Sequence, residues 1–162
     1  MGRTLLVFAF LVVVIGMVCA VQQCGDGYTR RGYYGNCYKV SLHRDLWIQA
    51  RERCRLEGGW LVTIRNGVDQ NWVTDFYQRH SPRPCSDGYW IGANDIGNEK
   101  SWVWDENGDP VTYTNWQPEE PNNHNGREDA AEVRMSDSKW NDMDHLTGDE
   151  RCYICEKPPS SC

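Results

Sequence analysis

The cysteines constrain this chain more than any other feature, because their number and their setting decide how the fold is held together. Residues 1–20 contain Arg3, an apolar run over residues 5–18 and a small-residue end at Val18-Cys19-Ala20, which is the pattern of a cleaved secretory signal. One of the eight cysteines lies in this segment. In an exported chain the remaining seven are expected to form disulfides. We therefore predict a secreted, extracellular protein in which at least one thiol is free or pairs with another chain.

The remaining residues, 21–162, have the length of one domain. The 23 acidic side chains of the chain outnumber its 17 basic ones, for a formal net charge of −6. Binding to nucleic acid or to an anionic membrane requires clustered lysines and arginines, so neither partner is expected. The leader's apolar run is shorter than the roughly 20 residues that span a bilayer, and no later run is more apolar. The composition instead suits a protein that binds cations.

Hydrophobic periodicity predicts an α+β domain, with a hairpin over residues 24–40 and two helices over residues 45–57 and 68–80. Asn66 is placed to cap the second helix. The predicted buried faces are Trp47, Ala50 and Cys54 in the first helix and Trp72, Val73 and Phe76 in the second. Short strands are predicted at residues 60–64, 89–93, 102–104, 131–135 and 152–155.

A polar stretch over residues 105–129 is too long for an ordinary connection. Loops of this length inside a compact domain are usually functional or disordered, and the eight tryptophans of the chain argue against disorder. Oxygen-bearing side chains gather in this stretch and shortly after it, at Glu120, Asn122, Glu128, Asn141 and Asp142. Ca²⁺ takes six to eight oxygens from such groups. Because the spacing of an EF-hand is missing, a solvated surface loop remains the alternative from the residues alone.

The order of short motifs along the chain resembles that of the C-type lectin domain family, in its long form, over residues 24–157. The motifs that carry the resemblance are Cys24 with Cys37, Cys54 followed by Gly58-Gly59 and Leu61-Val62-Thr63-Ile64, Trp90-Ile91-Gly92, Trp102-Val103-Trp104, Asn115-Trp116, Glu120-Pro121-Asn122, Glu128-Asp129, Trp140-Asn141-Asp142 and Tyr153-Ile154-Cys155-Glu156. Each motif alone is a weak indication of the family, but the order that they share is specific for it. The resemblance implies a C-type lectin fold with two helices, small antiparallel sheets and a long calcium-binding loop.

The resemblance also implies roles for individual residues. The ligands of a principal Ca²⁺ would be Glu120, Asn122, Glu128, Asn141 and Asp142, and those of a second Ca²⁺ would be Asp95, Glu99, Asn123, Glu128 and Asp129. Some family members carry Asp at the position of Asn123. Pro121 is expected to follow a cis peptide bond. The principal ligands would also bind a pair of sugar hydroxyls, and His124 either packs on the sugar or is simply exposed.

The predicted function is calcium-dependent carbohydrate binding. In the family, the Glu-Pro-Asn form of the motif favours equatorial 3- and 4-hydroxyls, as in mannose, glucose, N-acetylglucosamine and fucose. The alternative is a matrix protein that binds calcium carbonate or chitin, because the resemblance extends to perlucin-like proteins of mollusc shells. An enzyme is not expected, since no nucleophile stands beside a base and the four histidines show no partner pattern.

The chain departs from the family pattern at the disulfide that usually braces the calcium loop. Its two cysteines are replaced together, by Ala130 and His145. The resemblance implies the pairs Cys24–Cys37 and Cys54–Cys155. For the remaining cysteines we favour Cys85–Cys152, which would leave Cys162 to link two chains into a homodimer, with Cys85–Cys162 as the competing pair.

Overall fold

The computed structural model describes residues 24–25, 27–82 and 85–160, so the predicted signal segment and Cys162 lie outside the described residues. The chain divides into two compact units. Of the described residues, the smaller contains those up to Cys37 together with 158–160, and the larger lies within Tyr38–Lys157. Across the described ranges, no helix is long and apolar enough to cross a membrane.

The smaller unit contains strand β1 (Thr29–Arg30) and the turn that follows it. The backbone N–H of Arg31 donates to the carbonyl of Asn36 at 2.9 Å and closes the turn. A disulfide joins Cys24 to Cys37. This segment therefore has the first strand and the turn of the predicted hairpin, and its second strand, β2 (Cys37–Val40), continues into the larger unit.

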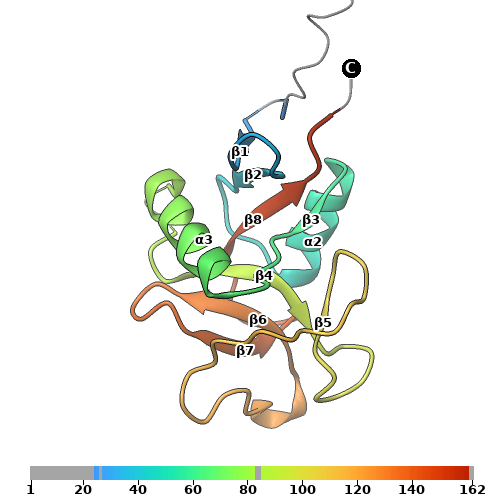
Figure 1. Ribbon diagram of the computed structural model, residues 1–162. Helices are drawn as coiled ribbons and strands as arrows, with labels where there is room; N and C mark the ends of the chain where they lie inside the picture. The colour runs from blue at the N-terminus through green and yellow to red at the C-terminus, as the bar shows by residue number, and fades with distance from the viewer. Residues whose placement is uncertain (1–23, 26, 83–84, 161–162) are drawn as a thin grey trace, which may run out of the picture. The chain divides into compact units, whose positions relative to one another are not determined.

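Two helices form where the hydrophobic periodicity predicts them, α2 (Trp47–Leu56) and α3 (Gly67–His80). The predicted face of α2 is buried, with Trp47, Ala50 and Cys54 no more than 1% exposed. Asn66 caps α3, because its side-chain oxygen accepts the backbone N–H groups of Val68 and Asp69 at 2.9 Å. In Figure 1 the two helices lie on either side of β8 (Cys152–Lys157).

The larger unit is built on a sheet with the strand order β2-β8-β4-β6-β7. The remaining strands are β3 (Trp60–Leu61), β4 (Gly88–Asn94), β5 (Val103–Trp104), β6 (Glu128–Arg134) and β7 (Trp140–Asp144). The expected antiparallel pairing is found for β3 with β8, β4 with β5 and β6, and β6 with β7, whereas β4 and β8 run parallel. Strand β8 lies on one side of β4, and β6 followed by β7 lies on the other. After β7 the chain therefore returns to β4 to form β8, its last strand. The β6–β7 hairpin and the loop before it lie at the lower end of Figure 1.

Aromatic side chains fill the core of the larger unit. Trp140 is fully buried, and its indole N–H donates to the side-chain oxygen of Gln70 at 2.7 Å. The rings of Trp104, Tyr113 and Trp116 meet it edge-on, with centroids 5.4–6.1 Å away. Disulfides join Cys54 to Cys155 and Cys85 to Cys152. The core thus connects both helices, the sheet and the long polar loop.

Replacing Trp140 with Ala should lower the free energy of unfolding by about 3–5 kcal/mol, the usual cost of removing a large buried aromatic side chain. Urea unfolding monitored by circular dichroism measures the loss. Leu56→Ala is the control, since Leu56 is 79% exposed and its removal should change stability by less than about 0.5 kcal/mol. Equal effects of the two substitutions would contradict this assignment of the core.

Candidate functional site

The polar loop between β5 and β6 is fixed to the sheet by contacts with β7. Gln117 donates its backbone N–H to the carbonyl of Trp140 at 2.9 Å, and Trp140 donates in turn to Asn115. The ring of Trp116 packs edge-on against that of Trp140. Trp140 therefore anchors the loop, and the two residues that follow it, Asn141 and Asp142, are held at the loop's polar end.

Asp142 joins β7 to the tip of the loop. Its side chain is 1% exposed, and its two carboxylate oxygens accept the backbone N–H groups of Asn122 at 3.1 Å and Asn123 at 2.7 Å. The peptide bond between Glu120 and Pro121 is cis, as expected. Glu120, Asn122 and Asp142 are therefore brought together although 20 residues separate the last two in the sequence.

The segment after Asn123 turns back on itself through a short 3₁₀ helix, His124–Gly126. Glu128 accepts the backbone N–H of His124 at 2.8 Å, and its own backbone N–H donates to the side-chain oxygen of Asn123 at 3.1 Å. These bonds place the Glu128 carboxylate beside the Glu120–Asn123 segment. Burial, and then the nearby charge of Asp142, raise the pKa of both Glu120 and Glu128.

Among the described residues, no Lys or Arg lowers the pKa of Glu120 or Glu128. Burial, then the neighbouring Asp142 and Glu128, raise the pKa of Glu120 to about 7. Oxygen Oε2 of Glu120 is buried and receives no hydrogen bond from the described residues. An ionised carboxylate is an acceptor with about four lone-pair sites, so Asp142 and Glu128 retain capacity beyond the bonds they accept. These features fit a cation that is held by oxygen ligands.

The residues predicted for a second ion also lie together. Asp95 is 3% exposed, its Oδ1 has no hydrogen-bond partner among the described residues, and burial, then Glu99 and Asp129, raise its pKa to about 6. The side-chain amide of Asn123 donates to Glu99. His145 lies beside this group, with its Nδ1 3.1 Å from Asp129, and this contact is an ion pair when the imidazole is protonated.

In the described ranges, no group of three His, Cys, Asp or Glu side chains is arranged to hold an ion. Carboxylates and histidines alone therefore do not form a metal site there. The predicted principal set contains two amides as well. Asn122 follows the cis peptide bond directly, and Asn141 precedes Asp142 on β7. The five predicted ligands thus come from two short segments that the Asp142 hydrogen bonds hold together.

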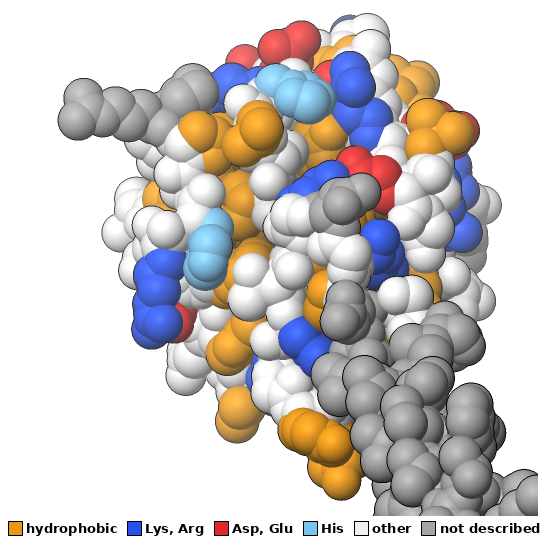
Figure 2. Space-filling model, turned by 90° about the horizontal axis from the view of Figure 1, so that it is seen from above, with side chains coloured by type: hydrophobic (Ala, Val, Ile, Leu, Met, Phe, Trp, Pro, Cys, Tyr) orange, Lys and Arg blue, Asp and Glu red, His pale blue; other side chains and the backbone are white. Residues whose placement is uncertain are grey.

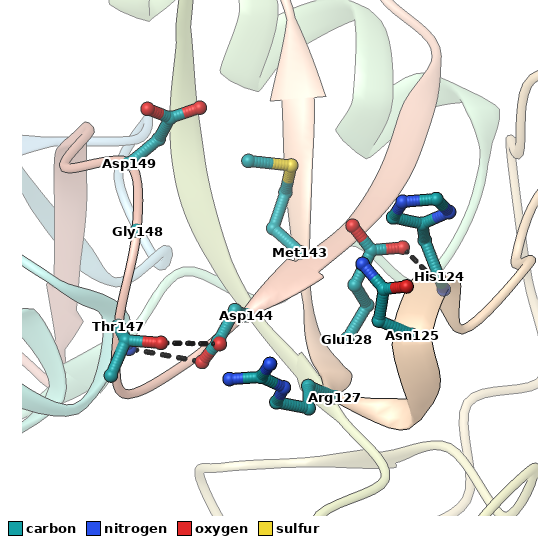
Figure 3. A pocket seen from close by; sticks show the side chains of 9 residues that line it. All are labelled: His124, Asn125, Arg127, Glu128, Met143, Asp144, Thr147, Gly148 and Asp149. Carbon is teal, nitrogen blue, oxygen red and sulfur yellow. Dashed lines mark hydrogen bonds between the residues drawn. The ribbon is translucent and has the colours of Figure 1, made fainter.

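A groove with a volume of about 330 Å³ adjoins Glu128. Figure 3 shows Met143 between His124 and Glu128 on one side and the segment from Thr147 to Asp149 on the other. The sequence analysis named His124 and Glu128 and missed Met143. No sequence pattern pointed to Met143, because strand β7, which places it, was not predicted.

Comparison with known proteins identifies the class of protein to which this fold and this site belong. The sequence model described as "Lectin C-type domain" matches residues 43–157. The chain therefore belongs to the C-type lectin domain family, whose members bind carbohydrates and are not enzymes. The expected family, fold class and absence of enzymatic activity are confirmed.

Individual relatives cover nearly the whole chain. The chain is 32% identical to a perlucin-like protein of Mytilus galloprovincialis over 152 residues, 94% of each chain. It is 30% identical to the galactose-specific lectin nattectin of Thalassophryne nattereri, over 93% of this chain and 94% of the relative. Among solved structures, the C-type lectin CEL-I of Cucumaria echinata superposes with a TM-score of 0.73 at 25% identity, covering 83% of this chain and 96% of CEL-I.

Replacing Asp142 with Asn should loosen the tip of the loop. Hydrogen bonds to charged acceptors contribute about 1.5–3 kcal/mol, so the amide protons of Asn122 and Asn123 should exchange roughly tenfold faster or more. Hydrogen exchange followed by NMR measures the rates. In the control Asp144→Asn, faster exchange should instead appear at Leu146 and Thr147, whose N–H groups donate to Asp144. Unchanged rates at Asn122 and Asn123 in Asp142→Asn would refute this role.

Proposed function

We propose that this C-type lectin is a secreted, calcium-dependent carbohydrate-binding protein that prefers mannose-type sugars. The observation that supports it most directly is the buried Oε2 of Glu120, which lies in a group of carboxylates with raised pKa values and has no donor among the described residues. A divalent cation bound by Glu120, Asn122, Glu128, Asn141 and Asp142 removes this deficit. Asp95, Glu99, Asn123 and Asp129 would hold a second ion beside the first.

The chemistry of the site follows from its side chains. When bound, Ca²⁺ supplies coordination positions for two neighbouring sugar hydroxyls. The carboxylates of Glu120 and Glu128 accept hydrogen bonds from those hydroxyls, and the amides of Asn122 and Asn141 donate to them. Each hydroxyl then meets one donor and one acceptor. His124 and Met143 border the adjoining groove and supply surface for the sugar ring.

The proposed specificity depends on which residue carries the acid and which the amide. Glu120 and Asn122 stand in the order that the family associates with equatorial 3- and 4-hydroxyls, as in mannose and N-acetylglucosamine. A relative at 30% identity is named as galactose-specific, so overall similarity does not decide the sugar. We therefore base the mannose-type preference on these two side chains.

The surface charge argues against a nucleic-acid partner. The chain has a formal net charge of −6. On the face shown in Figure 2, basic side chains are interspersed with acidic and apolar ones and do not gather into a patch. Recognition through phosphates requires clustered basic side chains. A neutral, hydroxyl-rich ligand bridged by a cation suits an acidic chain better.

Binding of mannose should depend on Ca²⁺ and disappear when the ion is removed. Isothermal titration calorimetry on the oxidised protein should give a dissociation constant of about 1 mM for the monosaccharide, or about −4 kcal/mol. Excess EDTA should abolish the signal, and Ca²⁺ should restore it. Mg²⁺ should not restore it, because that ion is smaller and demands octahedral geometry. Mannose binding that persists in EDTA would refute the proposal.

Exchanging the acid and the amide should change the preferred sugar. In the double variant Glu120→Gln, Asn122→Asp, the charge is conserved while the donor and acceptor positions are reversed. Affinity for mannose should fall roughly tenfold or more and galactose should become the better ligand, because misplaced polar partners are costly in a site built for hydrogen bonds. A glycan array run with and without Ca²⁺ reads out the change. A variant that still prefers mannose would contradict this assignment of specificity.

A matrix role is the second candidate, supported by the perlucin-like relative at 32% identity and by the acidic composition. Calcium carbonate or chitin would then be the ligand. The two candidates separate in one experiment with a variant in which all five principal ligands are replaced by Ala. Adsorption to calcium carbonate that survives those substitutions favours the matrix role, and its loss favours a function carried by the ion site.

A further inference from the structure

A buried ion pair lies next to one of the predicted ligands. Glu132 on β6 pairs with Asn141 on β7 in the antiparallel register, so the two side chains share one face of the hairpin. Glu132 is only 3% exposed. The side-chain nitrogen of Asn141 donates to Oε1 of Glu132 at 3.4 Å. Neither the family motif nor the predicted ligand set includes Glu132.

The chemistry of this contact fixes the orientation of the Asn141 amide. An ionised carboxylate only accepts hydrogen bonds, whereas an amide has a donating NH₂ edge and an accepting oxygen edge. Only the NH₂ edge can face Glu132 favourably. The oxygen of Asn141 is then directed away from Glu132 and is available as a ligand, while the second hydrogen of the NH₂ group remains available for another acceptor.

Glu132 is itself held in place by Arg151, at the start of β8. Nε of Arg151 donates to Oε2 of Glu132, and Arg151 is 9% exposed. Arg151 also lies 3.9 Å from Asp87 and 3.6 Å from Asp149. Arg44 in turn holds Asp87 through two hydrogen bonds of 2.8 and 2.7 Å. A buried carboxylate needs a paired charge or hydrogen-bond donors, and here the pairing joins Glu132 to three other segments of the chain, around Arg44, Asp87 and Arg151.

We propose that Glu132, held by Arg151, is a positioning residue that sets the amide of Asn141 with its oxygen toward the ion site. The proposal rests on the proposed function, in which Asn141 is a ligand. It adds a residue outside the motif that controls how strongly the site binds. Partners of this kind, which orient a ligand without touching the metal, typically change metal affinity 10- to 100-fold when they are replaced.

The test is the substitution Glu132→Gln, which keeps the size of the side chain. A Gln amide can either donate or accept, so the orientation of Asn141 is no longer fixed. In the metal-free protein, NMR should show the two side-chain amide protons of Asn141 shifted or broadened relative to wild type. Titration calorimetry should show Ca²⁺ affinity lower by roughly tenfold or more.

Glu156→Gln is the matched control. Glu156 is also a buried carboxylate, 4% exposed, whose hydrogen-bond partners include the backbone and hydroxyl of Thr63 and the hydroxyl of Tyr38. The same chemical change at this position should lower the melting temperature and leave both the Asn141 amide signals and the Ca²⁺ affinity as in wild type. A merely structural role for Glu132 predicts that the two variants behave alike.

The outcomes distinguish the two proposals. If wild type takes up no Ca²⁺, the proposed function fails, and the metal-free Asn141 signals still decide whether Glu132 orients the amide. If those signals and the Ca²⁺ affinity are unchanged in Glu132→Gln, the positioning role is overturned. Should this variant not fold, the double variant Glu132→Gln, Arg151→Met takes its place, because removing both charges of a buried pair is often close to neutral for stability.

Discussion

The hydrogen bonds that Asp142 accepts from the backbone of Asn122 and Asn123 join the polar loop to the sheet, and the rest of the site depends on them. Three consecutive residues of the five-residue strand β7 have three different roles. Trp140 anchors the loop in the core, the amide of Asn141 donates to Glu132, and Asp142 fixes the loop tip. The three residues thus connect the core, the neighbouring strand β6 and the loop tip.

The electrostatics of the site contrast with those of the rest of the larger unit. Elsewhere, buried carboxylates are matched by cations or by hydrogen-bond donors. Asp105, whose side chain is 1% exposed, pairs with Arg51 and Arg55, and Glu132 pairs with Arg151. Glu120 and Asp95 have buried oxygens without a donor among the described residues, and burial and neighbouring acids raise the pKa of both. Perturbed groups that gather in this way mark functional sites, and here the missing charge is positive.

Local patterns in the sequence predicted the helices well and the sheet less well. The buried face of α2 and the Asn66 cap of α3 follow from spacing over a few residues. Strand β7 was missed, because Trp-Asn-Asp-Met-Asp lacks apolar alternation, and its pairing with β6 is what makes it a strand. The parallel β4–β8 pair and the Glu132–Arg151 contact join distant residues, which no spacing reveals. The ligand set came from family resemblance, since the same residues alone fit a solvated loop.

Because Ala130 and His145 replace the family's bracing disulfide, the proposed ion would matter more to the stability of this loop. A native disulfide contributes about 2–4 kcal/mol. In its place, Ala130 packs in the interior and His145 lies 3.1 Å from Asp129, an exchange of a covalent constraint for weaker contacts. A ligand that binds only the folded loop stabilises it by RT ln(1 + [L]/Kd), about 2.7 kcal/mol at a hundredfold excess over Kd. A cation bound as proposed would supply stabilisation of the same size as the absent crosslink, and order in this loop would then be linked to calcium concentration.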